Sequence, residues 1–309
     1  MKLTFVDDFR LAAVTDGGVV YLDSLVQGVD GFPPQLILST VISRWSEYQP
    51  VFETAIESKE PIDIDTVRLR PPTPQPTSIV CMAGNYMEFG TLPKKPQQTA
   101  FFKSSYAVIG EGDTMQLPDV PASIFEGEAE MALVISKRAS KVKPEDAMDY
   151  VFGYMNFVDG SARGLAAGMG LPYFMKCKDT FAPVGPYIVT ADEVDDPHKL
   201  QIKQWNNGKV THDYNTDDMA YTIAETVAFV TFNSTLDVGD VIAVGVNHGQ
   251  LHPLQDGDVV EQEIDGLGRL TFKVQDDLKR TWKRETRAER AAAGGTGATP
   301  QLTGKYAEG

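Results

Sequence analysis

The sequence contains few cysteines, few histidines and no long apolar run. Its two cysteines among 309 residues, Cys81 and Cys177, lack the spacing of a metal site and are too few for a disulfide framework. No apolar run approaches the roughly 18–20 residues that a membrane-spanning helix needs. Acidic residues also stand where a signal peptide has its apolar part. We therefore expect a cytoplasmic protein that does not bind membranes.

Positive charge is scarce as well. Lys and Arg number 28 against 43 Asp and Glu, so the formal net charge is −15. This balance argues against a nucleic-acid partner, because phosphates need a basic face. It does not exclude a small anionic substrate, because a bound divalent cation reverses the field locally.

The first 70 residues are predicted to form a small α/β domain. Short apolar stretches at Leu11–Val14 and Val19–Leu22 flank a turn and indicate a hairpin. A helical pattern follows over Gln35–Ser58. Four prolines within residues 71–76 cannot continue a helix or a central strand, so we place a domain boundary there.

Residues 71–280 are predicted to form a larger, β-rich domain, followed by a C-terminal tail over 281–309 that is flexible unless a partner subunit orders it. Two helices are expected, at Lys143–Phe152 and Thr222–Asn233. Because strands outnumber them, we predict an α+β, mostly β fold rather than a doubly wound sheet. The predicted strands are Ser78–Met82, Met131–Ile135, Pro186–Val189, Val241–Val246 and Val259–Ile264.

Two acidic residues open an apolar strand. Glu128 and Glu130 alternate, so in a strand they point to the same face. Two carboxylates so close repel unless a cation neutralises them, and hard oxygen ligands suit Mg²⁺, Mn²⁺ or Ca²⁺. The alternative is a solvated acidic strand edge.

Two further segments carry charged residues in unusual surroundings. Asp159 lies in an apolar stretch close before Arg163, where an acid needs a cation or hydrogen bonds. A structural pair between these two residues is the alternative. Lys176 could hold a substrate carboxylate or an enolate oxygen as a point charge, although a surface lysine is the simpler interpretation.

Together and in this order, the segments from about Leu69 to Val274 resemble the fumarylacetoacetate hydrolase (FAH) family. Each motif alone is weak, but their common order over roughly two hundred residues is specific. The matching motifs are Gly84-Asn85-Tyr86, Phe101-Phe102-Lys103, Gly112–Pro118, Glu128-x-Glu130, Asp159 with Ser161 and Arg163, Lys176-x-x-Asp179 with Pro183-x-Gly185-Pro186, Asn215-Thr216 and Leu236–Ile242.

The resemblance implies an FAH-like mixed β-roll, a homodimer, and a Mg²⁺ or Mn²⁺ ion held by Glu128, Glu130 and Asp159. It implies small keto or diketo acid substrates, whose adjacent keto and carboxylate oxygens chelate the metal. Residues of the same motifs are the expected substrate-binding groups: Tyr86, Arg163 and Lys103.

The sequence departs from the family at its general base. Many members carry a histidine and a glutamate just after the Asn-Tyr turn, and these positions are Phe89 and Leu92 here. Glu88 is adjacent, but a neighbouring strand residue would face the other way. Among the four histidines, His248 ranks first as a replacement because its loop resembles an active-site loop, and His212 follows. Lys176 completes the catalytic candidates.

The leading hypothesis is a metal-dependent hydrolase that cleaves a C–C bond in a β-diketo acid such as an acylpyruvate, through a metal-stabilised enolate. A decarboxylase or isomerase of keto dioates is the alternative, since such chemistry needs less water activation. A hypothesis of another class is a non-catalytic homologue that binds metal or ligand.

Overall fold

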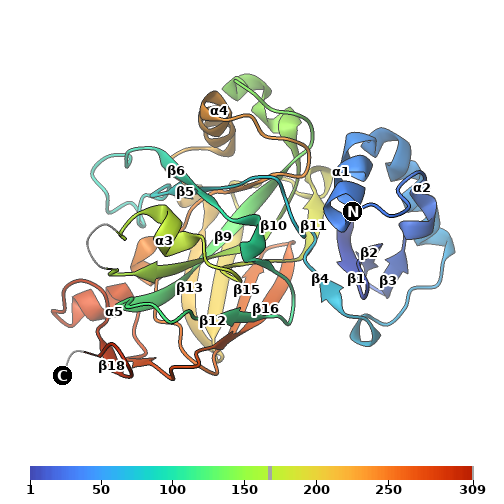
Figure 1. Cartoon of the computed structure of the whole chain (residues 1–309). Coiled ribbons are helices and arrows are strands. Elements are labelled where there is room, and N and C mark those ends of the chain that lie inside the picture. The colour runs from blue at the N-terminus through green and yellow to red at the C-terminus, as the bar shows by residue number, and fades with distance from the viewer. Residues whose placement is uncertain (166–168, 308–309) are drawn as a thin grey trace.

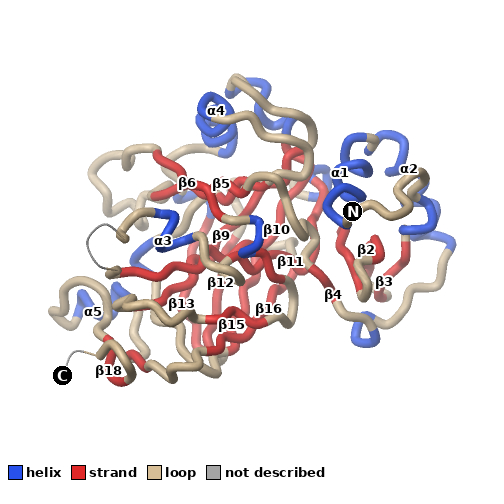
Figure 2. The backbone as a smooth tube through the Cα atoms, viewed as in Figure 1, coloured by secondary structure: helices blue, strands red, loops and turns tan. Residues whose placement is uncertain are grey.

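The computed structural model describes residues 1–165 and 169–307, and β-sheets dominate it. Strands fill the centre of the molecule, and the helices lie at its periphery (Figures 1 and 2). The predicted α+β, mostly β architecture with mixed sheets is confirmed.

The large sheet has the strand order β3-β2-β1-β11-β10-β9-β14-β5-β6, with β4 and β7 attached at its side. Its strands are β1 (Lys2–Val6), β2 (Arg10–Thr15), β3 (Gly18–Tyr21), β4 (Leu69–Arg70), β5 (Ile79–Ala83), β6 (Thr99–Lys103), β7 (Val108–Ile109), β9 (Ile124–Ile135), β10 (Val151–Arg163), β11 (Ala182–Thr190) and β14 (Val241–Ala243).

Two smaller sheets complete the β structure. The five-stranded sheet has the order β13-β12-β15-β16-β8, and a two-stranded ribbon pairs β17 with β18. These strands are β8 (Thr114–Gln116), β12 (Gln201–Asn206), β13 (Lys209–Asn215), β15 (Val259–Ile264), β16 (Gly268–Gln275), β17 (Thr281–Trp282) and β18 (Gln301–Thr303).

The helices are short. They are α1 (Pro34–Ser43), α2 (Trp45–Ser58), α3 (Pro172–Lys176), α4 (Ile223–Asn233) and α5 (Arg287–Ala292). Single 3₁₀ segments cover Asp23–Leu25, Ile64–Thr66, Ser105–Ala107, Pro144–Tyr150, Ala191–Glu193, Thr216–Asp218 and His248–Gln250. No helix among the described residues is long and apolar enough to cross a membrane.

The N-terminal residues form the expected hairpin and helices, with one correction. The helix predicted over Gln35–Ser58 is divided, because Arg44 adopts a non-helical conformation with φ −117° and ψ 31° between α1 and α2. The N-terminal strands also continue the large sheet, since Lys2 of β1 pairs with Val189 of β11. This pairing places β1 next to β11, the strand that follows β9 and β10 in the chain.

β9 and β10 lie at the centre of the large sheet and are buried almost throughout. One face of β9 packs Ala132 and Val134 against the α1 and α2 side of the core, and the other packs Met131 and Leu133 against α4. Two long strands buried on both faces make a rigid base, so the side chains that they carry are held firmly in place.

The C-terminal residues are folded, which contradicts the expectation of a flexible tail. Trp282 is 2% exposed, and its indole N–H donates to the Ser123 carbonyl at 2.7 Å. Glu285 is 6% exposed and pairs with Arg290 at 3.2 Å. α5 of this segment lies at the lower left of Figure 1, and its Arg287 donates to Glu126 of β9 at 2.6 Å. Few residues of this segment are apolar, so the sequence pattern did not predict that it packs against the rest of the chain.

Candidate metal centre and active site

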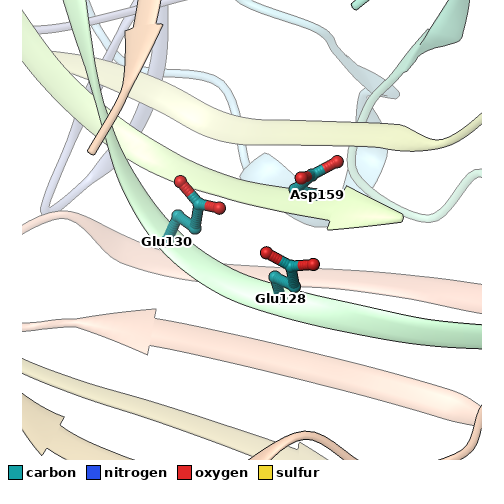
Figure 3. A group of neighbouring side chains, drawn as sticks. All are labelled: Glu128, Glu130 and Asp159. Carbon is teal, nitrogen blue, oxygen red and sulfur yellow. The ribbon is translucent and has the colours of Figure 1, made fainter. Parts of the chain in front are cut away.

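Three buried carboxylates gather where β9 and β10 run side by side. Glu128 and Glu130 share a face of β9 by strand alternation, and Asp159 of β10 is the register partner of Glu128. One oxygen from each of the three carboxylates lies within 4.8 Å of the others. Figure 3 shows the three side chains turned toward one another. The structure thus brings together the three predicted metal ligands.

Two buried lysines neutralise part of this negative charge. Lys176, at the end of α3, donates to Glu128 Oε1 and to Asp159 Oδ2, both at 2.5 Å. Lys103, at the end of β6, donates to Asp159 Oδ1 at 2.5 Å and to the Lys176 carbonyl at 2.7 Å. Burial lowers the pKa of Lys176, but Asp159 and Glu128 outweigh this and raise it overall, so its ammonium stays charged.

Arginines hold the outer end of the acidic strand. Arg163 donates to Glu126 Oε2 at 2.5 Å and also to Glu128 Oε1. Arg287 of α5 grips the other side of the Glu126 carboxylate, with contacts of 2.9 and 2.6 Å. Glu126 is therefore satisfied by two guanidinium groups. The C-terminal segment thus contributes an ion pair to Glu126, two residues before Glu128.

Glu130 differs from its neighbours because one of its oxygens has no partner. The Gly245 N–H donates to Oε2 at 2.7 Å, while Oε1 is buried without a hydrogen-bond partner among the described residues. Burial, followed by the charges of Asp159 and Glu128, raises the pKa of Glu130 well above its usual range. A buried carboxylate oxygen that lacks a partner fits a cation ligand.

Glu128 shows the opposite shift. Burial alone would raise its pKa, but the positive charges of Lys176 and Arg163 outweigh burial and hold it below its usual range. The site therefore combines one carboxylate kept charged by its neighbours with another that has an oxygen, unpartnered within the described residues, free to bind a cation. This oxygen-only donor set suits Mg²⁺ or Mn²⁺.

His248 is paired with a glutamate that the sequence argument had set aside. Glu88 lies in a turn rather than a strand, and its left-handed φ of 53° carries the carboxylate back toward the loop of His248. Glu88 Oε1 accepts from the His248 backbone N–H at 2.9 Å and lies 3.2 Å from His248 Nδ1. The expectation that Glu88 faces away is therefore wrong, because it assumed strand geometry.

The second candidate base, His212, lies in different surroundings. It is fully buried on β13, with Nδ1 3.2 Å from the Gln204 side-chain amide nitrogen. Burial, and then the neighbouring His252, lowers its pKa well below the usual range, so it stays neutral. Solvent does not reach its ring, whereas the His248 side chain is 35% exposed.

The remaining predicted substrate residue, Tyr86, is 1% exposed and stands edge-on to Tyr214, with ring centroids 5.0 Å apart. Its hydroxyl is buried without a partner in the described part of the chain. Burial raises the pKa of Tyr86 well above its usual range, so the hydroxyl keeps its proton and can donate it in a hydrogen bond.

Sequence reasoning missed three contributors to the site: Glu126, Arg287 and Gly245. Glu126 continues the alternation of Glu128 and Glu130, and this signal could have included it. The tertiary fold brings Arg287 and the Gly245 N–H to the site, so no local sequence pattern predicts their contacts.

Comparisons with known proteins agree with this fold. Residues 78–275 match the family described as fumarylacetoacetate (FAA) hydrolase C-terminal. A maleylpyruvate hydrolase of Sphingobium sp. SYK-6, solved with manganese(II) and pyruvate, superposes with a TM-score of 0.81 at 32% identity. That match covers 89% of this chain and 99% of the other.

Two other similar proteins have different printed activities. An oxaloacetate tautomerase of Bacillus subtilis is 32% identical over 225 residues, which is 68% of this chain and 74% of that protein. A 2-hydroxyhepta-2,4-diene-1,7-dioate isomerase structure from Mycobacterium marinum has a TM-score of 0.70 at 26% identity, covering 90% of this chain and 99% of the other.

The fold and the acidic centre define a class of proteins built on a mixed β-roll with a carboxylate cage. The family match spans well over half of the sequence. This chain belongs to the fumarylacetoacetate hydrolase family.

Proposed function

We propose that this protein is a divalent-metal-dependent hydrolase that cleaves a C–C bond in a small acylpyruvate-type β-diketo acid. The observation that carries the proposal is the cage of three buried carboxylates, one of which has an oxygen without a partner among the described residues. The similarity to a maleylpyruvate hydrolase over 89% of this chain supports the same reaction class.

Glu128, Glu130 and Asp159 would hold the metal ion, and Mg²⁺ or Mn²⁺ suits their oxygen donors. When bound, such an ion polarises a carbonyl and stabilises the negative charge of an enolate. Manganese in the maleylpyruvate hydrolase structure supports this choice of ion. We also propose a cytoplasmic homodimer, and light scattering on the purified protein would test the dimer.

Lysine and arginine side chains would bind the acidic substrate. Lys176 and Arg163 both contact Glu128. Lys103 contacts Asp159, another carboxylate of the cage. The Lys176 ammonium stays charged, so it can pair with a carboxylate or enolate oxygen of the substrate. The buried Tyr86 hydroxyl is a further donor.

His248 is the proposed general base. Its ring would take a proton from water, and the resulting hydroxide would add to the distal carbonyl carbon of the diketo acid. The C–C bond then breaks to give a carboxylic acid and the enolate of the other fragment. A proton returned to the enolate carbon completes the reaction, which consumes one water. His212 is a weaker candidate because its ring is buried.

A second candidate function is the isomerisation or tautomerisation of a keto dioate. The similarity to an oxaloacetate tautomerase and to a dioate isomerase favours it. Here His248 would move a proton between atoms of the substrate without adding water, and no bond between carbon atoms would break. Decarboxylation of a keto dioate and metal binding without catalysis are the remaining alternatives.

A turnover screen separates these functions. The metal-loaded protein would be incubated with 2,4-diketo acids, oxaloacetate and unsaturated dioates, and products would be identified by mass. Two carbon fragments with one added water support the hydrolase, loss of CO₂ supports a decarboxylase, and unchanged mass with altered absorbance supports the isomerase. Metal binding with no turnover of any substrate would overturn the enzymatic proposal.

A further inference from the structure

We infer that Glu88 is a positioning residue that fixes the tautomer and orientation of His248, so that these two loop residues form the histidine–glutamate pair missing from its usual positions. This inference rests on the proposed function, because it assigns how the proposed base is prepared. The usual positions hold Phe89 and Leu92, and the pair is assembled from two separate segments of the chain instead.

The turn that presents Glu88 is fixed by its own backbone. Glu88 and Phe89 both have left-handed φ angles, 53° and 59°. Such angles are unfavourable for a residue with a side chain, so the surroundings must hold them. Asp218 does so: its carbonyl accepts from the Met87 N–H and its carboxylate accepts from the Phe89 N–H, both at 2.9 Å.

Three N–H groups of one loop meet the Glu88 carboxylate. The backbone N–H of His248 and that of Gly249 donate to its two oxygens, at 2.9 and 3.1 Å. Burial raises the pKa of Glu88, but the hydrogen bonds from His248 and Gly249 outweigh burial and lower it. The carboxylate is therefore ionised and can only accept hydrogen bonds. The third N–H is that of the His248 ring.

This ionised acceptor determines the tautomer of His248. Because Nδ1 lies 3.2 Å from Glu88 Oε1, Nδ1 must carry the proton and donate it. Neutral His248 therefore keeps a lone pair on Nε2, which is the atom that can take a proton from water. The same arrangement stabilises the imidazolium that forms when Nε2 is protonated.

The loop that carries His248 also touches the metal cage. The Gly245 N–H donates to Glu130 at 2.7 Å, three residues before the N–H that donates to Glu88. The Asn247 side chain accepts from the Gly249 N–H, which closes a short turn around His248. One stretch of backbone therefore connects Glu130 to Glu88, and the placement of His248 relative to the cage depends on both ends.

The test compares Glu88→Ala and Glu88→Gln with the unchanged protein. A matched control is Asp196→Asn, because Asp196 also stands beside a histidine, His198, at 3.6 Å on the surface. We expect Glu88→Ala to lower kcat by about 10- to 100-fold, the usual cost of removing an outer hydrogen-bond partner, with unchanged KM and metal affinity. Glu88→Gln should retain part of the activity, since its amide oxygen can still accept from Nδ1, and Asp196→Asn should behave like the unchanged protein.

A second readout is independent of turnover. Nitrogen NMR of labelled histidine, recorded with Mg²⁺ bound, would report which ring nitrogen of His248 carries the proton. We expect the Nδ1–H form in the unchanged protein and a mixture of both forms in Glu88→Ala. A melting temperature close to that of the unchanged protein would show that each variant is folded.

The two proposals fail in different ways. If the unchanged protein turns over no keto acid but the tautomer changes in Glu88→Ala, the pair stands and the proposed function fails. If the tautomer and kcat are unaffected in Glu88→Ala, the inference about Glu88 is overturned, whatever the substrate. A loss of metal affinity that accounts for the whole loss of activity would also overturn it, since Glu88 would then act only through the cage.

Discussion

The carboxylate cage and the Glu88–His248 pair are built in different ways. The cage stands on β9 and β10, two buried central strands whose register sets Glu128 opposite Asp159. The pair stands on two loops, and hydrogen bonds to the loop backbone hold it in place. Regular structure fixes the position of the buried charges, and loops hold the histidine that we propose exchanges a proton with solvent.

This difference has an energetic consequence. Side chains on the buried strands are closely packed and shielded from water. A substitution in the cage therefore leaves neighbouring buried charges without a partner, and water cannot replace it. A loop substitution exposes its groups to water, which replaces part of the lost hydrogen bonding. We therefore expect substitutions in the cage to abolish metal binding and substitutions in the pair to slow only the chemistry.

The largest effect is expected from Glu128→Gln. Loss of this charge removes one ligand of the cage and frees Lys176 and Arg163 from their shared partner. Metal affinity, measured by calorimetry, should fall by roughly 100-fold or more, because a ligand matters at least as much as its outer partners, and turnover should fall with it.

The matched control for this prediction is Glu126→Gln. Glu126 lies on the same face of β9, but both of its oxygens are taken by Arg163 and Arg287. We expect metal affinity to change much less in this variant, with a loss of thermal stability instead. Equal losses of metal affinity in Glu126→Gln and Glu128→Gln would contradict the assignment of the ligands.

A narrower effect is expected from His248→Gln, which should change turnover but not metal binding. Removal of a general base costs about 10²- to 10⁴-fold in rate, and His248 contacts Glu88 rather than the cage carboxylates. Turnover should fall within this range while metal affinity measured by calorimetry stays unchanged. Full activity in this variant would show that the base is another residue or solvent.

The same contrast explains what the sequence could predict. Alternation placed Glu128 and Glu130 on one face, because a strand has a fixed two-residue period. The order of the motifs added Asp159 and Lys176, which lie far from these two glutamates in sequence yet close in space. Strand segments and the overall fold class were likewise accessible, since apolar runs between turn residues mark them.

The rest depended on conformations that no local pattern specifies. Glu88 was placed facing away because strand geometry was assumed, whereas its left-handed backbone turns it toward His248. The break at Arg44 and the contact between Arg287 and Glu126 also come from tertiary packing. Loop pairs and long-range ion pairs are decided by the whole fold, so a sequence without structure does not show them.

A third prediction uses the buried histidine as a comparison for the exposed one. His212→Gln should destabilise the protein by about 1–3 kcal/mol, because Gln204 and Thr211 lose their partner in a buried site. Chemical denaturation would measure this loss. The kcat of the folded variant should stay close to that of the unchanged protein, and a loss comparable to that of His248→Gln would instead favour His212 as the base.

The smallest effect is expected in the acid stability of the fold. Burial, and then the charges of Arg284 and Lys209, lowers the pKa of His252 from 6.5 to about 3. The unfolded chain therefore takes up a proton on this residue below pH 6.5 while the folded protein does not, so stability falls as the pH drops from 6.5 toward 3. Between about pH 7.5 and about pH 5.5 this group should account for about 1 kcal/mol, since one pKa unit corresponds to about 1.4 kcal/mol.

Urea unfolding of metal-free protein at these two pH values would measure the loss, with His252→Asn as the comparison. The side-chain amide introduced by this substitution can still accept the hydrogen bond that the Asn206 amide gives to His252 Nε2 at 2.9 Å, but it does not titrate. The unchanged protein should therefore lose about 1 kcal/mol more than the variant on acidification. An equal loss in both proteins would mean that His252 is protonated in the folded state, and that the buried side of the five-stranded sheet admits water and charge as readily as the loop of His248.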